Sequence, residues 1–60
     1  MILPADDYIL ISVLNTKLRD LYPSLEELCE EEGLVCDDVV SRAEAAGYAY
    51  DGKTNSFKII

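Results

Sequence analysis

Three segments determine the fold: Ser24-Leu-Glu-Glu-Leu-Cys-Glu-Glu-Glu-Gly33, then Cys36-Asp-Asp-Val-Val-Ser-Arg-Ala-Glu-Ala-Ala-Gly47, and then Tyr48-Ala-Tyr-Asp-Gly-Lys-Thr-Asn-Ser-Phe-Lys-Ile-Ile60. The first two segments predict helices, each closed by a glycine that can adopt the left-handed conformation. The third alternates with period two around a turn-forming stretch, which predicts a hairpin. We therefore expect an α+β fold in which a three-helix, helix-turn-helix-like bundle precedes a C-terminal β-hairpin, as in a winged helix.

The two central helices differ in how clearly they begin. Ser24-Leu-Glu-Glu27 forms a capping box, in which the serine hydroxyl binds the Glu27 amide and the Glu27 carboxylate binds the Ser24 amide. Leu25, Leu28 and Cys29 follow as the buried stripe. The next helix begins at Val35 or Cys36, and neither residue is a good cap.

The hairpin is expected to depend on the helices for its stability. Tyr48–Tyr50 and Phe57–Ile59 are the predicted strands, and residues 51–56 form the turn. An isolated two-stranded ribbon is marginal in water. One aromatic face should therefore dock on the bundle.

A further helix is predicted from Asp6 or Asp7 to about Tyr22. An aspartate suits the positive end of a helix, and Pro23 ends the segment. Its apolar residues recur at helical spacing and form one stripe: Leu10, Leu14, Leu18 and Leu21. Ile9 and Val13 widen that stripe beyond what a small core covers, so we expect them to form a self-association surface.

Length and charge restrict the classes of function. The 60 residues form one domain, residues 1–60, with a net charge of −7. The charge is −1 over residues 1–23, −7 over 24–47 and +1 over 48–60. The negative electrostatic field of residues 24–47 disfavours binding to nucleic acid and to anionic membranes, and it favours a basic partner.

The sequence contains no constellation expected of an enzyme. It has two cysteines and no histidine, so a zinc site would require carboxylate ligands or a second chain. Cys36 lies at a helix start, which can lower a thiol pKa, but no histidine is present to act as its base. Cys29 is expected to be an inert core thiol. Adjacent carboxylates such as Asp37 and Asp38 point about 100° apart on a helix and do not converge. We predict no catalytic residue, no cofactor and no metal.

The start of the chain carries no basic, apolar leader, and its apolar runs are too short for a membrane span. The expected location is the cytoplasm.

DNA binding is the alternative that the helix-turn-helix pattern suggests. In that motif the second helix leads into the major groove with its N-terminal residues. Here those residues are Cys36, Asp37 and Asp38, and Arg42 is the only basic residue on the helix. DNA affinity derives largely from Lys and Arg neutralising phosphates. Nucleic acid is therefore not the expected partner.

One polar run, Asn15-Thr-Lys-Leu-Arg-Asp20, is specific enough to suggest interaction. Lys17 falls inside the apolar arc of its helix. Either its stem covers apolar surface while the ammonium reaches water, or the ammonium is held by a tyrosine, a backbone carbonyl or a partner's carboxylate. The candidate interaction residues are Ile9, Val13, Asn15, Lys17, Arg19 and Asp20.

Several segments together resemble a known family. They are Leu3-Pro-x-Asp-x-Tyr8, Asn15-Thr-Lys-Leu-Arg-Asp20, Ser24-Leu-x-x-Leu-Cys29, Gly47-Tyr-x-Tyr-Asp51 and Asn55-x-Phe57. The chain resembles a family of short bacterial proteins that is known only as a domain of unknown function. The resemblance implies a bacterial, cytoplasmic, stand-alone protein and transfers no catalytic residue. Val35 departs from the family, where a polar cap such as Asp is expected.

These observations lead to one functional hypothesis and one alternative. We expect a non-enzymatic protein–protein interaction module that forms a homodimer through its first helix. The alternative is a winged helix-turn-helix protein that binds DNA or assists transcription.

Overall fold

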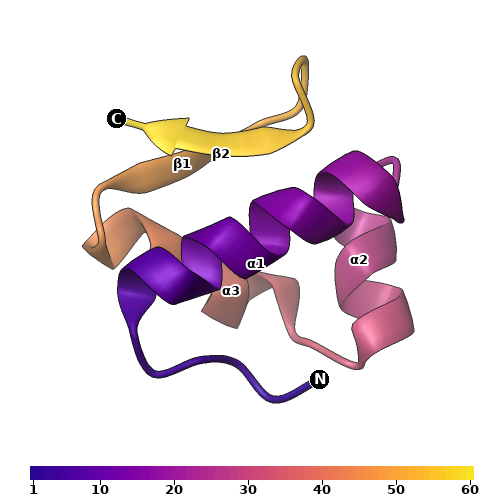
Figure 1. The fold of residues 1–60 in the computed structure, drawn as a ribbon, viewed down its shortest axis with the longest axis horizontal. Coiled ribbons are helices and arrows are strands. Elements are labelled where there is room, and N and C mark those ends of the chain that lie inside the picture. Colours follow the sequence, from indigo (N-terminus) through magenta and orange to yellow (C-terminus); the bar gives the residue numbers. More distant parts are fainter.

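The computed structural model describes all residues, 1–60, and contains three helices followed by a hairpin (Figure 1). The helices are α1 (Asp7–Asp20), α2 (Leu25–Glu32) and α3 (Cys36–Ala45). The strands β1 (Tyr48–Asp51) and β2 (Ser56–Ile59) pair antiparallel. The α+β prediction is confirmed.

Most of the predicted helix ends are confirmed. Asp6 caps α1 by accepting the Ile9 amide, and Ser24 caps α2 by accepting the Glu27 amide. The reverse bond of the capping box, from the Ser24 amide to Glu27, is absent. Gly33 closes α2 at φ 71°, in the left-handed region. Val35 precedes α3 without a side-chain cap, so the first turn of α3 has only its acidic residues to favour it.

The prediction for the end of α1 was wrong. The helix ends at Asp20 rather than near Tyr22. The amides of Leu21 and Tyr22 both donate to the Lys17 carbonyl, which closes the last turn before Pro23. Because Leu21 lies outside the regular helix, it leaves the buried stripe, and it is 64% exposed.

The core lies between the three helices and the inner face of the hairpin. Ten residues are buried, all of them apolar: Leu10, Ile11, Leu14, Leu18, Leu25, Leu28, Cys29, Val39, Ala43 and Phe57. Phe57 is the only hairpin residue among them, and its ring packs tilted against Tyr50 at 5.5 Å between centroids. The hairpin therefore docks by an aromatic face, as predicted.

Asn15 on α1 joins the hairpin to the helices through backbone atoms. Its Oδ1 accepts the Phe57 amide at 2.7 Å, and its Nδ2 donates to the Phe57 carbonyl at 3.2 Å. A strand neighbour would make the same two bonds. The Asn15 carboxamide thus takes the place of an additional strand at the outer edge of β2.

Asn55 forms the second polar joint, at the end of the turn. It has a positive φ of 52°, and its Nδ2 donates to the carbonyls of Leu18 and Tyr22. Its Oδ1 accepts the Tyr50 hydroxyl at 2.6 Å. These bonds satisfy carbonyls that the end of α1 leaves without helical partners.

Replacing Asn15 with Ala should lower the free energy of unfolding by about 2 kcal/mol, because the Phe57 amide and carbonyl lose their partners in a half-buried place. Ser12→Ala, at an exposed position of the same helix, is the control and should change stability little. Urea unfolding followed by circular dichroism measures both. Equal stability of the two variants would contradict this role for Asn15.

At position 55, Gly and Ala separate the backbone from the side chain. Both variants lose the three side-chain bonds, but only Ala also meets the cost of a left-handed conformation. Asn55→Ala should therefore be less stable than Asn55→Gly by about 1 kcal/mol, and both should be less stable than the parent. Thermal unfolding compares the three proteins, and a more stable Ala variant would contradict the assignment.

Candidate functional site

The outward side of α1 is a helix face without a partner in the chain. It carries two parallel rows at four-residue spacing, which together we call the α1 face. One row is Ile9, Val13, Lys17 and Leu21, and the other is Tyr8, Ser12, Thr16 and Asp20. Tyr8, Ile9 and Leu21 are 74%, 55% and 64% exposed. Large apolar side chains are thus exposed in the first turn of α1 and at the residue that directly follows the helix.

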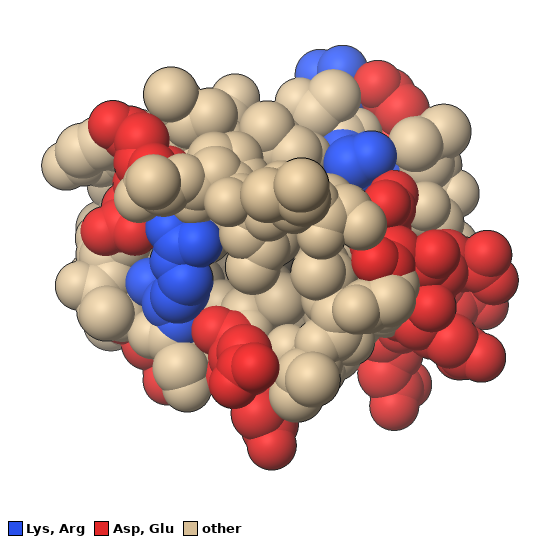
Figure 2. Space-filling model, turned by 90° about the horizontal axis from the view of Figure 1, so that it is seen from below, with Lys and Arg blue, Asp and Glu red and all other residues tan.

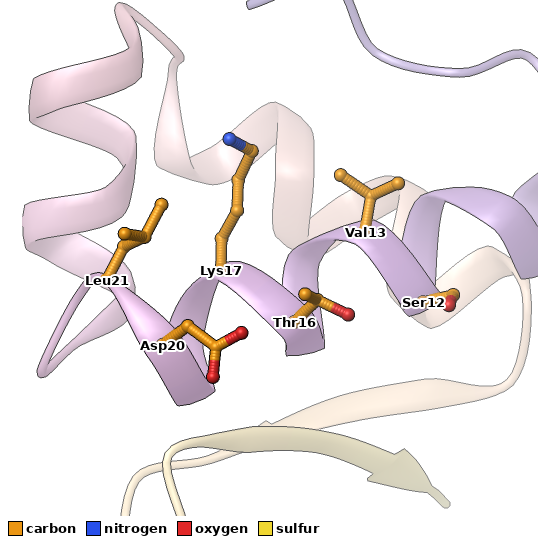
Figure 3. Close-up of a pocket in the computed structure, with 6 residues that line it drawn as sticks. All are labelled: Ser12, Val13, Thr16, Lys17, Asp20 and Leu21. Carbon is orange, nitrogen blue, oxygen red and sulfur yellow. The ribbon is translucent and has the colours of Figure 1, made fainter.

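A shallow groove of about 380 Å³ lies on the α1 face. Its lining residues are Ser12, Val13, Thr16, Lys17, Asp20 and Leu21. Figure 3 shows the side chains of Val13, Lys17 and Leu21 extending to the same side of α1, with those of Ser12, Thr16 and Asp20 in the row beside them. A second depression, of about 410 Å³, continues past Leu21 to Pro23 and Asn55.

The ammonium of Lys17 is held within its own chain. Its Nζ lies 3.1 Å from Glu32 Oε2, and the same oxygen accepts the Tyr22 hydroxyl at 2.8 Å. The N-terminal amine of Met1 donates to the Glu32 carbonyl at 3.1 Å. Lys17 and Glu32 are 27% and 18% exposed at their side chains, and Lys17 also lines the groove.

These contacts shift two pKa values in opposite directions. The hydrogen bond from Tyr22, followed by that from Lys17, stabilises the Glu32 carboxylate and lowers its pKa. The hydrogen bond to Glu32, followed by burial, raises the pKa of the Tyr22 hydroxyl. Both shifts favour the state in which Tyr22 donates to a charged Glu32.

The remaining predicted interaction residues separate into two kinds. Arg19 and Asp20 form an exposed pair, with Arg19 Nε 2.8 Å from Asp20 Oδ1, next to the groove. Their hydrogen bond raises the pKa of Arg19 and lowers that of Asp20. Asn15 lies away from the groove, because both ends of its carboxamide bind Phe57. Ile9, Val13, Lys17 and Asp20 therefore share one surface, and Asn15 does not belong to it.

The acidic side chains gather at another place. Figure 2 shows them crowded over α2, on the right of the view, where Glu26, Glu27, Glu30 and Glu31 are exposed. No cluster of three or more His, Cys, Asp or Glu side chains is arranged to hold a metal ion. The α1 face and the acidic surface of α2 are therefore separate features.

The two cysteines lie at the junction of α2 and α3. Cys36 Sγ lies 3.8 Å from the Leu25 carbonyl, and Cys29 is buried one turn further along α2. Burial, followed by the hydrogen bond with Cys36, raises the pKa of the Cys29 thiol to about 12. A thiol with such a pKa is a poor nucleophile at neutral pH.

None of the three helices combines the length and the hydrophobicity needed to cross a membrane. The fold and its surfaces define a small α+β protein with an open helix face and an acidic flank. The model of a family described as a domain of unknown function (DUF4250) matches residues 4–57, and the chain belongs to that family. No curated protein and no solved structure matches the chain.

Replacing Glu32 with Gln should flatten the acid end of the stability profile. The folded pKa of Glu32 lies below its unfolded value, so its contribution is present above about pH 5 and is lost as the pH falls through the folded pKa. The free energy of unfolding of Glu32→Gln should fall less steeply below that pH. Glu31→Gln is the control, because Glu31 is exposed and makes no ion pair. A parallel loss of slope in both variants would contradict the prediction.

Proposed function

We propose that the protein is a small, non-enzymatic protein–protein interaction module, and that the α1 face is its docking surface. The observation that carries this proposal is the groove between the two rows of α1, with exposed Ile9 and Leu21 beside it. Large apolar side chains that are exposed beside a groove are typical of a site that binds another protein.

The spacing of the rows indicates the shape of the partner. Rows at four-residue intervals are the ridges that interdigitate in the commonest class of helix–helix packing, at about −50° between axes. Ser12, Val13 and Thr16 are small and lie near the middle, so a second helix can approach closely there. The partner of the α1 face is accordingly a helix with an apolar ridge.

Charge adds a preference to that shape. The cations on and beside the groove, Lys17 and Arg19, are already paired with carboxylates of the same chain. The nearby surface of α2 is strongly acidic. A partner helix with basic residues at its flanks would complement this arrangement, and the association would weaken at high salt.

The DNA-binding alternative has less support. Asp37 and Asp38 are exposed in the first turn of α3, where phosphates would lie. Arg42, the only basic residue of α3, donates to the Ala5 carbonyl and to Asp7 Oδ1. Arg42 would have to break these bonds before it could neutralise the charge of a phosphate.

A photo-crosslinking amino acid placed in the groove tests the proposal in cells that produce the protein. Thr16 is exposed and lines the groove, and Ser41 on α3 is an equally exposed control position. The probe at position 16 should yield a discrete adduct that the probe at position 41 does not. Identical adduct patterns, or no adduct at position 16, would count against a docking role.

A pair of matched substitutions provides the specificity control. Ile9 and Val35 are similarly exposed, at 55% and 62%, but only Ile9 belongs to the α1 face. Ile9→Asp should remove the position-16 adduct, whereas Val35→Asp should leave it intact. Circular dichroism of the purified variants verifies that both remain folded.

A further inference from the structure

The two edges of the hairpin differ in how their backbone groups are used. The Ile60 amide donates to the Gly47 carbonyl at 3.0 Å, and the register pairs Ala49 with Lys58. In an antiparallel ladder, hydrogen-bonded and non-hydrogen-bonded pairs alternate. The N–H and C=O groups of Tyr48 and Tyr50 on β1, and of Phe57 and Ile59 on β2, therefore point away from the ladder.

The outer edge of β2 is covered at Phe57, whereas the outward backbone groups of Ile59 have no partner in the chain. The Phe57 amide and carbonyl are both bound by Asn15, and Lys58 is exposed one residue further along. A lysine on an edge strand and a covering side chain are two ways in which proteins prevent strands from adding to a sheet.

The outer edge of β1 carries no such protection. Its sequence is Tyr48-Ala-Tyr-Asp51, with neither proline nor lysine, and no bond of the chain reaches the backbone groups of Tyr48 or Tyr50. The strand is nevertheless held firmly. The Tyr50 hydroxyl donates to Asn55 and accepts the Leu25 amide at 3.3 Å, so the edge is fixed before any partner arrives.

We propose that β1 pairs antiparallel with β1 of a second copy, so that the two hairpins form one continuous sheet. The free groups of Tyr48 and Tyr50 lie symmetrically about Ala49. Pairing Tyr48 of each copy with Tyr50 of the other satisfies all of them, with about four hydrogen bonds about a two-fold axis at Ala49. The edge of β1 is thus complementary to the same edge of a second copy.

The side chains and the charge permit this pairing. Tyr48 and Tyr50 share the inner face with Phe57, so Ala49 projects from the opposite face and meets only the small Ala49 of the other copy. Asp51 lies opposite Gly47 of the other copy, beyond the hydrogen bonds of the pairing. Residues 48–60 carry a net charge of +1, whereas residues 24–47 carry −7, so the hairpin is the part of the surface where two acidic chains can approach.

This dimer surface is distinct from the α1 face. The sequence assigned self-association to Ile9 and Val13, whereas the unpaired backbone groups assign it to β1. Both α1 faces remain open in the resulting dimer, so each copy can still dock another protein. Because each chain carries −7, added salt should strengthen the dimer, in contrast to docking of a basic partner.

A charge exchange at the two-fold axis tests the proposal by sedimentation equilibrium and native mass spectrometry. Ala49→Asp and Ala49→Lys each place like charges opposite one another and should be monomeric, whereas an equimolar mixture should form the heterodimer. Since Lys58 lies opposite Ala49 within the hairpin, circular dichroism and thermal unfolding establish that each variant is folded. In the unmodified protein, hydrogen exchange of the Tyr48 and Tyr50 amides should slow as the concentration rises.

Four outcomes would overturn the proposal. They are a parent protein that stays monomeric up to about 1 mM, a dimer that survives both single substitutions, a mixture without heterodimer, and a dimer that Ile9→Asp disrupts while Ala49→Asp does not. The last outcome would return self-association to the α1 face. None of these results bears on the position-16 adduct with another protein, so docking and dimerisation are tested separately.

Discussion

The hydrogen bonds between the Asn15 carboxamide and the backbone of Phe57 are the constraint on which the rest of the structure depends. They fix the height at which β2 lies along α1, and with it the place where the Phe57 ring enters the core. On the side that faces the hairpin, the buried stripe of α1 is covered only when the Phe57 ring is in place. The same bonds cover Phe57 at the outer edge of β2, whereas Tyr48 and Tyr50 at the outer edge of β1 have no such cover.

Much of the polar run from Asn15 to Asp20 is explained by the fold. Asn15 holds the hairpin, Lys17 holds Glu32 of α2, and Leu18 is buried. A sequence pattern this specific invites an interpretation as a binding motif. In this chain Asn15 instead joins α1 to the hairpin and Lys17 joins it to α2, while Thr16, Lys17 and Asp20 border the groove.

The sequence predicts what local chemistry determines. Ser24 and Gly33 mark the ends of α2 because a cap and a left-handed residue act within one turn, and alternation predicts the strands. The contacts of Asn15 and Asn55 span 42 and 37 residues, so no local pattern indicates their partners. The prediction that Leu21 belongs to the buried stripe was wrong for a related reason. The apolar periodicity indicates a helix that continues to Leu21, whereas the bonds from the Leu21 and Tyr22 amides to the Lys17 carbonyl end the helix at Asp20. Ile9 and Val13 on the α1 face were found because an apolar arc wider than a core is visible in the sequence.

The span of the Asn15–Phe57 contact also has a consequence for the order in which the molecule assembles. The backbone bonds of α1 and α2 are local, but helices of 14 and 8 residues are marginal in water until they pack against other elements. The joint that closes the core links α1 to β2 across 42 residues. The entropic cost of closing a loop of this length must be met before the contacts between α1 and β2 can form. The apolar stripe of α1 therefore stays uncovered until residue 57 can reach it. On the ribosome, the fold is therefore completed only after residue 57 has emerged.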